Sequence, residues 1–338
     1  MSLMFAEAAD GAHAVRRQLA DPAPFDAAVD HIRALGPRAV VTCARGSSDH
    51  AATYAKYMIE TRLGLLVSSA SPSVASIYGG VAAGHGTLAL AISQSGGSPD
   101  LVATIEALRD AGAATLALVN VEGSPLSAAA DLTLPLCAGP EASVAATKSY
   151  IASLAMIARL VATLGDDDEL REAVTALPVL LEAAWRSDWS PLVQALREAR
   201  GLYVIGRGYG LGIAQEAALK FKETCGLHAE AFSAAEVRHG PMALVGPDMP
   251  LLVFRQGDET GAGVDALVAE AHERGATVMV ADGTGLPGTI ALPCPSAHPA
   301  IEPILQVQAF YRAVEALARA RGFDPDAPPH LRKVTETV

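Results

Sequence analysis

The sequence predicts an α/β fold with two doubly wound parallel-sheet domains, related by internal duplication, a helical connector and a C-terminal tail. Three observations support this prediction. Short apolar runs of strand length alternate with amphipathic helical stretches in both halves of the chain. The first unit of each half is similar, with VVTCARGSS at 40–48 and LYVIGRGYG at 202–210. The stretch between the two halves has a helical pattern and no strand-like run.

The first half begins with an amphipathic helix and is then expected to contain five strands separated mostly by helices. The expected strands are RAVVTC (38–43), LLVSSA (65–70), TLALAISQS (87–95), ATLALVN (114–120) and DLTLPL (131–136). Such mostly apolar runs are typical of a parallel sheet that is covered on both faces. A long apolar helix is expected over 143–164, and GDDDEL at 165–170 supplies a break and the acidic start of another helix.

The second half repeats this pattern after a helical connector. Its expected strands are GLYVIG (201–206), PLLVF (250–254), ATVMVAD (276–282) and TIALP (289–293), with helices over 211–225, 262–274 and 300–321. Residues after 322 are rich in proline and then basic, so we expect a tail and not another domain. The expected boundaries are a first domain at 1–164, a connector at 165–199, a second domain at 200–322 and a tail at 323–338.

Charge and cysteine content exclude several kinds of partner. The chain has 37 acidic and 25 Lys or Arg residues and a net charge of −12, which argues against nucleic-acid and anionic-membrane partners. The four cysteines lie far apart without a CxxC pair, as expected for free thiols in a reducing compartment. No apolar run is long enough to span a bilayer, and the N-terminus does not resemble a signal peptide. We therefore expect a soluble, cytoplasmic protein.

A loop rich in hydroxyls and glycines follows the third expected strand, where open α/β sheets bind their ligands. Its polar side chains are those of Ser93, Gln94, Ser95 and Ser98. Unpaired backbone N–H groups at a helix start can bind phosphate without lysine, and glycines let the backbone approach closely. The alternative is an ordinary serine-capped helix after a flexible turn. The number of hydroxyls at one strand end favours anion binding. The glycines of GRGYGLG, by contrast, do not complete a dinucleotide-binding motif.

The stretch 214–244 carries an unusual density of ionisable side chains. Glu216, Lys220 and Glu223 are spaced four and three apart, so they share one face of a helix. Taken alone, this spacing is more typical of an exposed, salt-bridged face. The residues that follow include His228, Glu230, Glu236 and His239, which do not form HExxH. The cluster therefore indicates a general acid and base in preference to a metal site.

Taken together, these motifs resemble the sugar isomerase (SIS) domain proteins, in particular the isomerase half of glucosamine-6-phosphate synthase and stand-alone deaminases of that type. The resemblance covers about residues 38–338. It rests on ARGSS, ISQSGGSPD, VAATKSY, ALKFKETCGLHAEAFSAAEVRHGPMAL and HLRKVTETV, in that order and with matching spacing.

The resemblance implies roles for individual residues. Substrate-binding positions are matched by Ser48, Ser93, Gln94, Ser95, Ser98, Val144 and Glu216, the serines and Gln94 being those that bind the sugar 6-phosphate. Glu223 matches the base that moves a proton between the first two sugar carbons, and Lys220 matches a supporting catalytic position. His239 matches the ring-opening histidine, supplied by the neighbouring subunit of a homodimer. Lys333 matches the lysine that folds over the open-chain sugar. The implied chemistry needs no metal and no organic cofactor.

Departures from the synthase pattern favour deamination. The sequence shows no glutaminase domain with an N-terminal cysteine nucleophile, and its ARGSSD loop and PPHLRKVTETV ending are more similar to the stand-alone deaminases. Ser98 stands where the synthase has threonine, which keeps the hydroxyl. We therefore expect an isomerising deaminase that converts glucosamine 6-phosphate and water to fructose 6-phosphate and ammonia. Two alternatives keep the same site: deamination of galactosamine 6-phosphate, and cleavage of a fructosamine 6-phosphate. A third is a non-catalytic sugar-phosphate sensor, although the sequence has no helix-turn-helix segment or basic extension.

Overall fold

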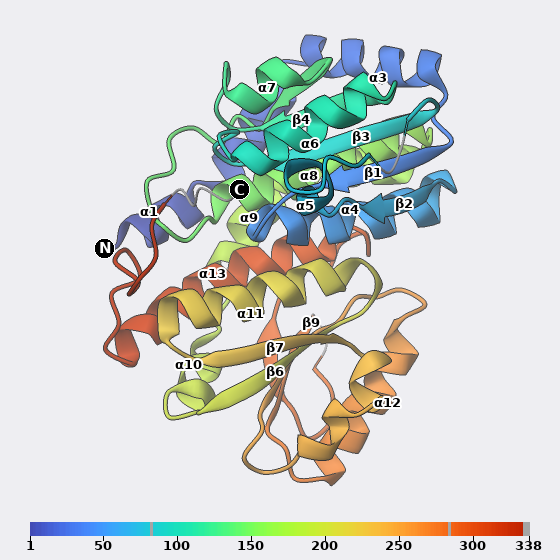
Figure 1. Cartoon of the computed structure of the whole chain (residues 1–338). Helices are drawn as coiled ribbons and strands as arrows, with labels where there is room; N and C mark the ends of the chain where they lie inside the picture. The colour runs from blue at the N-terminus through green and yellow to red at the C-terminus, as the bar shows by residue number, and fades with distance from the viewer. Residues whose placement is uncertain (82–83, 283–284, 334–338) are drawn as a thin grey trace. The chain divides into compact units, whose positions relative to one another are not determined.

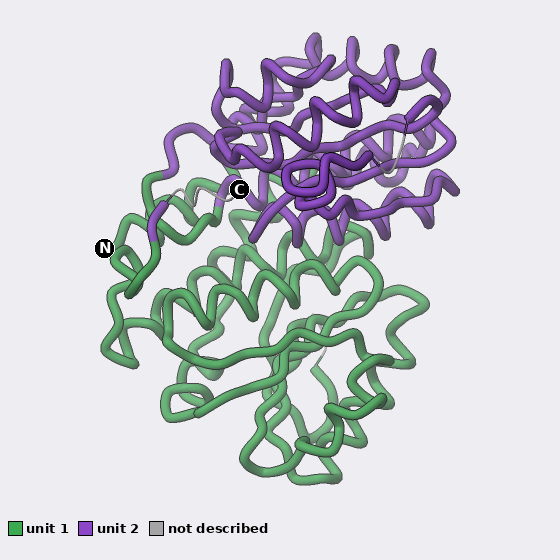
Figure 2. Tube along the Cα trace, in the orientation of Figure 1, with its two compact units in different colours: residues 1–12, 142–147, 176–331 green, residues 13–141, 148–175, 332–338 purple. Residues whose placement is uncertain are grey.

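The computed structural model describes residues 1–81, 84–282 and 285–333, which form two compact units, each built around a parallel five-stranded sheet (Figures 1 and 2). Unit 1 comprises residues 1–12, 142–147 and 176–331, and unit 2 comprises 13–141, 148–175 and the chain from 332. The predicted α/β class, with two doubly wound parallel sheets, is confirmed.

The sheet of unit 2 has the strand order β2-β1-β3-β4-β5, and all its strands are parallel. The strands are β1 (Ala39–Cys43), β2 (Leu66–Ser69), β3 (Thr87–Ser93), β4 (Ala114–Val119) and β5 (Leu132–Pro135). Its helices are α3 (Ala23–Leu35), α4 (Ser47–Leu63), α5 (Pro72–Ser76), α6 (Pro99–Asp110), α7 (Pro125–Ala129) and α8 (Lys148–Leu164). Alternate strand residues such as Val41 and Ala89 pack against Leu101 and Ile105 of α6 on one face. Helices α4 and α8 pack against each other, and α4 also contacts β1 and β3.

The sheet of unit 1 has the order β10-β9-β8-β6-β7, which is the order of unit 2 read from the opposite edge. Its strands are β6 (Gly201–Gly206), β7 (His228–Ser233), β8 (Leu251–Phe254), β9 (Val278–Asp282) and β10 (Ile290–Pro293). Its helices are α1 (Leu3–Ala9), α10 (Ser190–Leu196), α11 (Leu211–Cys225), α12 (Gly261–Glu273) and α13 (Glu302–Ala320), with short 3-10 turns at Gly208–Gly210, Glu236–Arg238 and Pro241–Leu244. The repeated strand order supports the predicted internal duplication.

Two helices belong partly to each unit. Helix α2 (Gly11–Ala20) and helix α9 (Asp168–Arg186) each begin in one unit and end in the other. The expected connector at 165–199 contains α9 and α10 and no strand, as its pattern indicated. The exact domain boundaries at 164, 199 and 322 stay a prediction. Within residues 1–81, 84–282 and 285–333, no helix combines the length and apolar character needed to cross a membrane.

Two local expectations were wrong. The helix expected over 143–164 begins only at Lys148, because Glu141 accepts hydrogen bonds from the backbone N and Oγ of Ser149 and so caps its first turn. Strand β7 was not expected, because HAEAFS has little apolar length. It lies at the edge of its sheet, with Ala229 buried and Glu230 exposed, so alternation and not hydrophobicity identifies it.

Candidate active site

The hydroxyl-rich loop lies at the point in unit 2 where the strand order reverses. Strands β1 and β3 are neighbours although β2 lies between them in sequence, so the chain leaves their carboxyl ends in opposite directions. Residues 44–48 follow β1, and residues 94–98 follow β3. Such a reversal creates a crevice where open α/β sheets bind ligands. The structure therefore brings Ser48 to the same sheet edge as the four polar residues of the second loop.

Hydrogen bonds within the second loop shape it into a turn of backbone donors. The buried Ser93 Oγ accepts from Gly96 N at 3.0 Å, and the Ser95 Oγ accepts from Gly97 N at 3.2 Å. Ser98 is the N-cap residue of α6, but its hydroxyl makes no capping bond within the helix. Ser48, Gln94, Ser95 and Ser98 are all partly exposed. Their side chains can therefore reach a ligand at a positively polarised helix start.

An ion pair joins the two loops. Arg45 donates from Nε and Nη2 to Asp100 Oδ2 at 3.0 and 2.8 Å, and the Asp100 side chain is fully buried. This pair links the loop after β1 to the first turn of α6. Neither residue was expected from the sequence, because the interaction spans 55 positions. Charge-assisted bonds of this kind fix geometry, so we interpret Arg45 and Asp100 as positioning the loops.

Gly96 is required by both conformation and space. Its φ is +62°, and a Cβ there would lie 2.1 Å from Ser124 Oγ. Only glycine fits such a position without a shift of the neighbouring chain. Gly96 O also accepts a hydrogen bond from Leu126 N. The glycine thus lets the loop pack against the segment before α7 while its N–H remains bonded to Ser93.

Glu216, Lys220 and Glu223 of α11 form a buried cluster in unit 1. The Lys220 Nζ lies 2.6 Å from Glu223 Oε2 and 3.2 Å from Glu216 Oε1. The side chains of Glu216 and Lys220 are 0% and 1% exposed, whereas that of Glu223 is 20% exposed. The alternative of an exposed, salt-bridged face is therefore wrong. Glu223 is the member of this cluster that a ligand can reach.

Tyr311 of α13 completes the cluster. Its hydroxyl donates to Glu216 Oε1 at 3.0 Å, and the tyrosine is fully buried. Burial alone lowers the pKa of Lys220, but the charges of Glu216 and Glu223 outweigh it and raise this pKa above its ordinary value. Lys220 is therefore a permanent cation at neutral pH that holds Glu223 in place. No local pattern predicted the contact of Tyr311, which lies 95 positions from Glu216.

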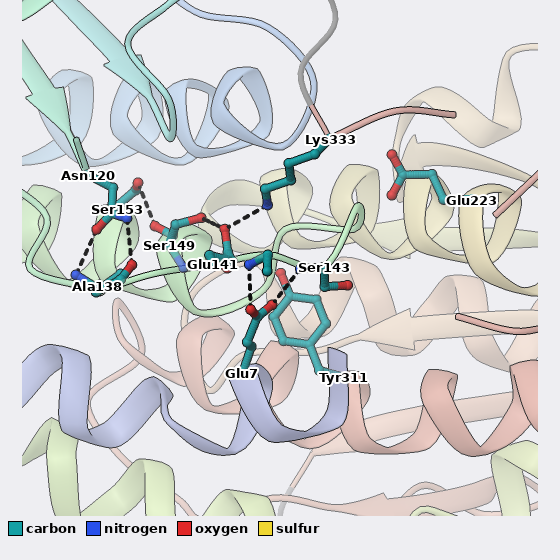
Figure 3. Close-up of polar contacts among 12 residues, drawn as sticks. Glu7, Asn120, Ala138, Glu141, Ser143, Ser149, Ser153, Glu223, Tyr311 and Lys333 are labelled. Atoms are coloured by element: carbon teal, nitrogen blue, oxygen red, sulfur yellow. Dashed lines mark hydrogen bonds and ion pairs between the residues drawn. The ribbon is translucent and has the colours of Figure 1, made fainter. Parts of the chain in front are cut away.

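Val144 lies in the segment 142–147, which belongs to unit 1. The Glu7 carboxylate accepts hydrogen bonds from Ala142 N and Ser143 N, and Figure 3 shows Glu7 pointing to this segment. Val144 itself is half-buried. Next to it, Ser143 is buried, and its Oγ has no hydrogen-bond partner among the residues that the structure describes. Ser143 is thus a further polar group at this segment that the sequence did not single out.

The structure describes local contacts for His239 and for Lys333. His239 is exposed after the Glu236–Arg238 turn in unit 1 and donates its backbone N–H to Glu236 O. Lys333 belongs to unit 2, where its Nζ lies 3.4 Å from Oε2 of the buried Glu141 (Figure 3). Residues 334–338 of the expected tail lie outside the described residues. The structure thus pairs Lys333 with a carboxylate that sequence reasoning missed.

Comparison with known proteins gives the chain its family. A model of the SIS domain matches residues 36–163 and 195–283. The glutamine–fructose-6-phosphate aminotransferase of Thermotoga maritima is 33% identical over 312 residues, covering 87% of this chain and 50% of that protein. Its counterpart in Pyrobaculum aerophilum is 37% identical over 268 residues, covering 74% and 44%. The chain therefore spans about half the length of these curated relatives.

Solved structures agree with this result. One such structure is a crystal structure of a protein from Silicibacter pomeroyi DSS-3, which is described as a phosphosugar isomerase with no substrate stated. The two sequences are 41% identical, and the structures match with a TM-score of 0.92 over 96% of this chain and 100% of that one. The glucosamine-6-phosphate deaminase of Thermotoga maritima, at 22% identity and a TM-score of 0.79, shares the fold over 99% and 100% of the two chains. From the matched segments, the duplicated sheets and the identity to these relatives, we conclude that this chain belongs to the SIS domain family.

Proposed function

We propose that the protein is an isomerising deaminase of an amino-sugar 6-phosphate, with glucosamine 6-phosphate as substrate. The observation that carries this proposal is the state of Glu223, a partly exposed carboxylate fixed at 2.6 Å from a buried lysine. A carboxylate with one fixed partner and access to solvent suits proton transfer next to a carbonyl carbon. The family and the names of its relatives support a sugar phosphate as the substrate class.

The proposed reaction proceeds from the open-chain sugar. Glu223 removes the proton from C2, and the electron pair forms a C1–C2 double bond as the C1 carbonyl becomes a hydroxyl. Return of a proton to C1 leaves a C=N bond at C2. Water then adds to C2 and ammonia leaves, so that glucosamine 6-phosphate and water give fructose 6-phosphate and ammonia. The buried cation of Lys220 keeps Glu223 oriented through these steps.

The loop at 93–98 is proposed to bind the 6-phosphate. Its partly exposed hydroxyls and the start of α6 supply donors and positive polarisation without a lysine. A negatively charged protein has to capture an anion by such local groups, because its net charge of −12 gives no long-range attraction. Ser48, at the start of α4, adds a further hydroxyl at the same sheet edge.

The remaining roles come from the resemblance. His239 of a neighbouring copy would open the sugar ring, since an imidazole can both accept and donate a proton near neutral pH. Lys333 would leave Glu141 and fold over the open-chain sugar as part of an active-site lid. Val144 would complete the substrate-binding set, whereas Glu216, whose side chain is 0% exposed, would act through its ion pair with Lys220 and not by touching the substrate. Removal of residues 328–338 is expected to abolish turnover while the fold and phosphate binding persist. A truncated protein with an unchanged rate would refute the role of the tail.

The direction of the reaction is the point at which the proposal departs from the curated relatives. Those proteins are named for transfer from glutamine to fructose 6-phosphate, and they are about twice as long as the matched region. The same carboxylate and lysine could serve synthesis from fructose 6-phosphate and free ammonia. Measurement in both directions with the purified chain decides between them.

The experiment is release of ammonia and fructose 6-phosphate from glucosamine 6-phosphate, with galactosamine 6-phosphate and a fructosamine 6-phosphate assayed in parallel. Faster turnover of the glucosamine compound supports the proposal, whereas preference for another compound would reassign the substrate. Tight sugar-phosphate binding with no turnover of any compound would contradict an enzymatic function and favour a sensor.

A further inference from the structure

Unit 2 contains a hollow that none of the residues discussed above lines. Its volume is about 380 Å³, which is within the range of small-molecule sites, about 300–1,000 Å³. It lies among the last turn of α2, the start of α3, the second half of α8 and the first half of α9. Its apolar lining residues are Leu19, Phe25, Ala162 and Val174.

Arg159 of α8 also lines the hollow and supplies a polar group. Its guanidinium carbon lies 3.9 Å from the centroid of the Phe25 ring, and its Nη1 donates to Gln18 O at 2.8 Å. No carboxylate of the described residues lies within ion-pair distance of it. Burial lowers the pKa of Arg159, although the more distant Asp26 opposes this. The guanidinium therefore loses water without gaining a counter-ion.

Three other arginines that are at least partly buried are paired with a carboxylate. Arg45 pairs with Asp100, Arg62 with Asp167, and Arg255 with Asp265. Such pairing is expected where a partly buried charge would otherwise remain uncompensated, and acidic residues outnumber Lys and Arg by 37 to 25 in this chain. Arg159 instead places its charge against a neutral carbonyl, an aromatic ring and the hollow.

The other polar groups of the hollow define what would fit beside Arg159. Arg171 is already neutralised by Asp166 and Asp168, and the Thr163 and Thr175 hydroxyls donate to backbone carbonyls of their own helices. The exposed Asp26 adds one negative charge to the lining. Arg159 can neutralise one negative charge, and the nearby Asp26 carboxylate would repel a second one. The lining therefore favours a ligand with a single negative charge over a dianion.

We propose that this hollow binds a small carboxylate with an apolar body. The carboxylate would bond to the remaining N–H groups of Arg159, whose planar fork suits a two-oxygen acceptor. The apolar body would lie against the apolar lining residues Leu19, Phe25, Ala162 and Val174. The Phe25 ring stacked on the guanidinium holds it in place, which lowers the conformational entropy lost on binding.

Benzoate is the probe, because it combines one carboxylate with one ring. Titration of the full chain, followed by methyl NMR signals of Ala162 and Val174, should give a saturable shift at millimolar concentration. Benzylamine and benzyl alcohol, which keep the ring and remove the negative charge, should give none. Phenyl phosphate should bind more weakly than benzoate at a pH where it is a dianion. Equal shifts with benzoate and benzyl alcohol would refute recognition of the carboxylate.

Two substitutions test the role of Arg159. R159Q should weaken benzoate binding by roughly 10- to 100-fold, the loss expected for a hydrogen bond to a charged group. R159K keeps the charge and the bond to Gln18 but loses the planar fork, so it should retain the fold and still bind more weakly. R186Q removes an equivalent charge from an exposed arginine of unit 1 and should leave binding unchanged. Unaltered affinity in R159Q or R159K, or no saturable binding to the wild type, would overturn the proposal.

Discussion

Substitution of Lys220 by methionine is the most demanding test of the buried cluster on α11. The change removes the cation between Glu216 and Glu223, and the Glu216 side chain, which accepts a hydrogen bond from Tyr311, is 0% exposed. Removal of one partner from a buried ion pair destabilises a protein by about 3–5 kcal/mol. For a unit of this size that corresponds to a fall in melting temperature of roughly 6–20 °C.

The sign of the pH dependence follows from the raised pKa of Lys220. A lysine whose folded pKa lies above its ordinary value of 10.5 contributes its full stability below pH 10.5, and that contribution is lost as pH rises through the folded pKa. The contribution is therefore constant between pH 6 and pH 9. The stability deficit of K220M relative to the wild type should therefore be the same at pH 6 and at pH 9 as far as Lys220 determines it.

Urea unfolding followed by far-UV circular dichroism, repeated across this pH range, measures the deficit. K222M is the matched control, because Lys222 is an exposed residue of the same helix and should lose little stability. A deficit below about 1 kcal/mol, the level of a surface ion pair, would refute a buried charge network. So would a deficit in K220M that is equal to that in K222M.

Two further predictions concern packing and thiol chemistry. G96A should lower the free energy of unfolding by more than G123A. Both glycines have a positive φ, but of the two only an added Cβ at Gly96 would meet another atom, Ser124 Oγ at 2.1 Å. Equal losses of stability in thermal unfolding would contradict the clash. Burial raises the pKa of Cys43 to about 12 and that of Cys225 to about 11. Both thiols should therefore resist iodoacetamide at pH 8 in the folded protein and react after denaturation. Rapid labelling of either thiol in the native protein, measured by mass spectrometry, would contradict this prediction.

Periodicity identified most of the fold because buried parallel strands are continuous apolar runs. AVVTC at β1 and TLALAIS at β3 are buried over most of their length, and most of their residues are apolar. Strand β7 was not predicted because an edge strand needs apolar residues on only one side. In β7, Ala229 is such a residue and is fully buried. The predicted start of α8 was wrong because two carboxylates hold the segment before the helix. Glu141 caps the first turn of α8, and Glu7, which is distant in sequence, accepts a hydrogen bond from Ser143 N.

The sequence predicted the motifs of the candidate site. It did not predict the residues from other elements that contact these motifs. Glu216, Lys220 and Glu223 share a helix, so spacing alone placed them together. Their burial and the bond from Tyr311 depend on α13, which no local pattern connects to α11. The Arg45–Asp100 pair and the Lys333–Glu141 pair are equally non-local, spanning 55 and 192 positions. A single sequence contains no signal for contacts of this kind.

The most direct test of the account is the rate of glucosamine 6-phosphate deamination by E223Q, with binding of the sugar phosphate measured in the same preparation. E230Q, an equivalent change at an exposed carboxylate on β7, is the control. E223Q should bind the sugar phosphate but lose turnover by at least about 100-fold, the contribution of one general base, while E230Q should keep the wild-type rate. Undiminished release of ammonia and fructose 6-phosphate by E223Q would contradict this prediction.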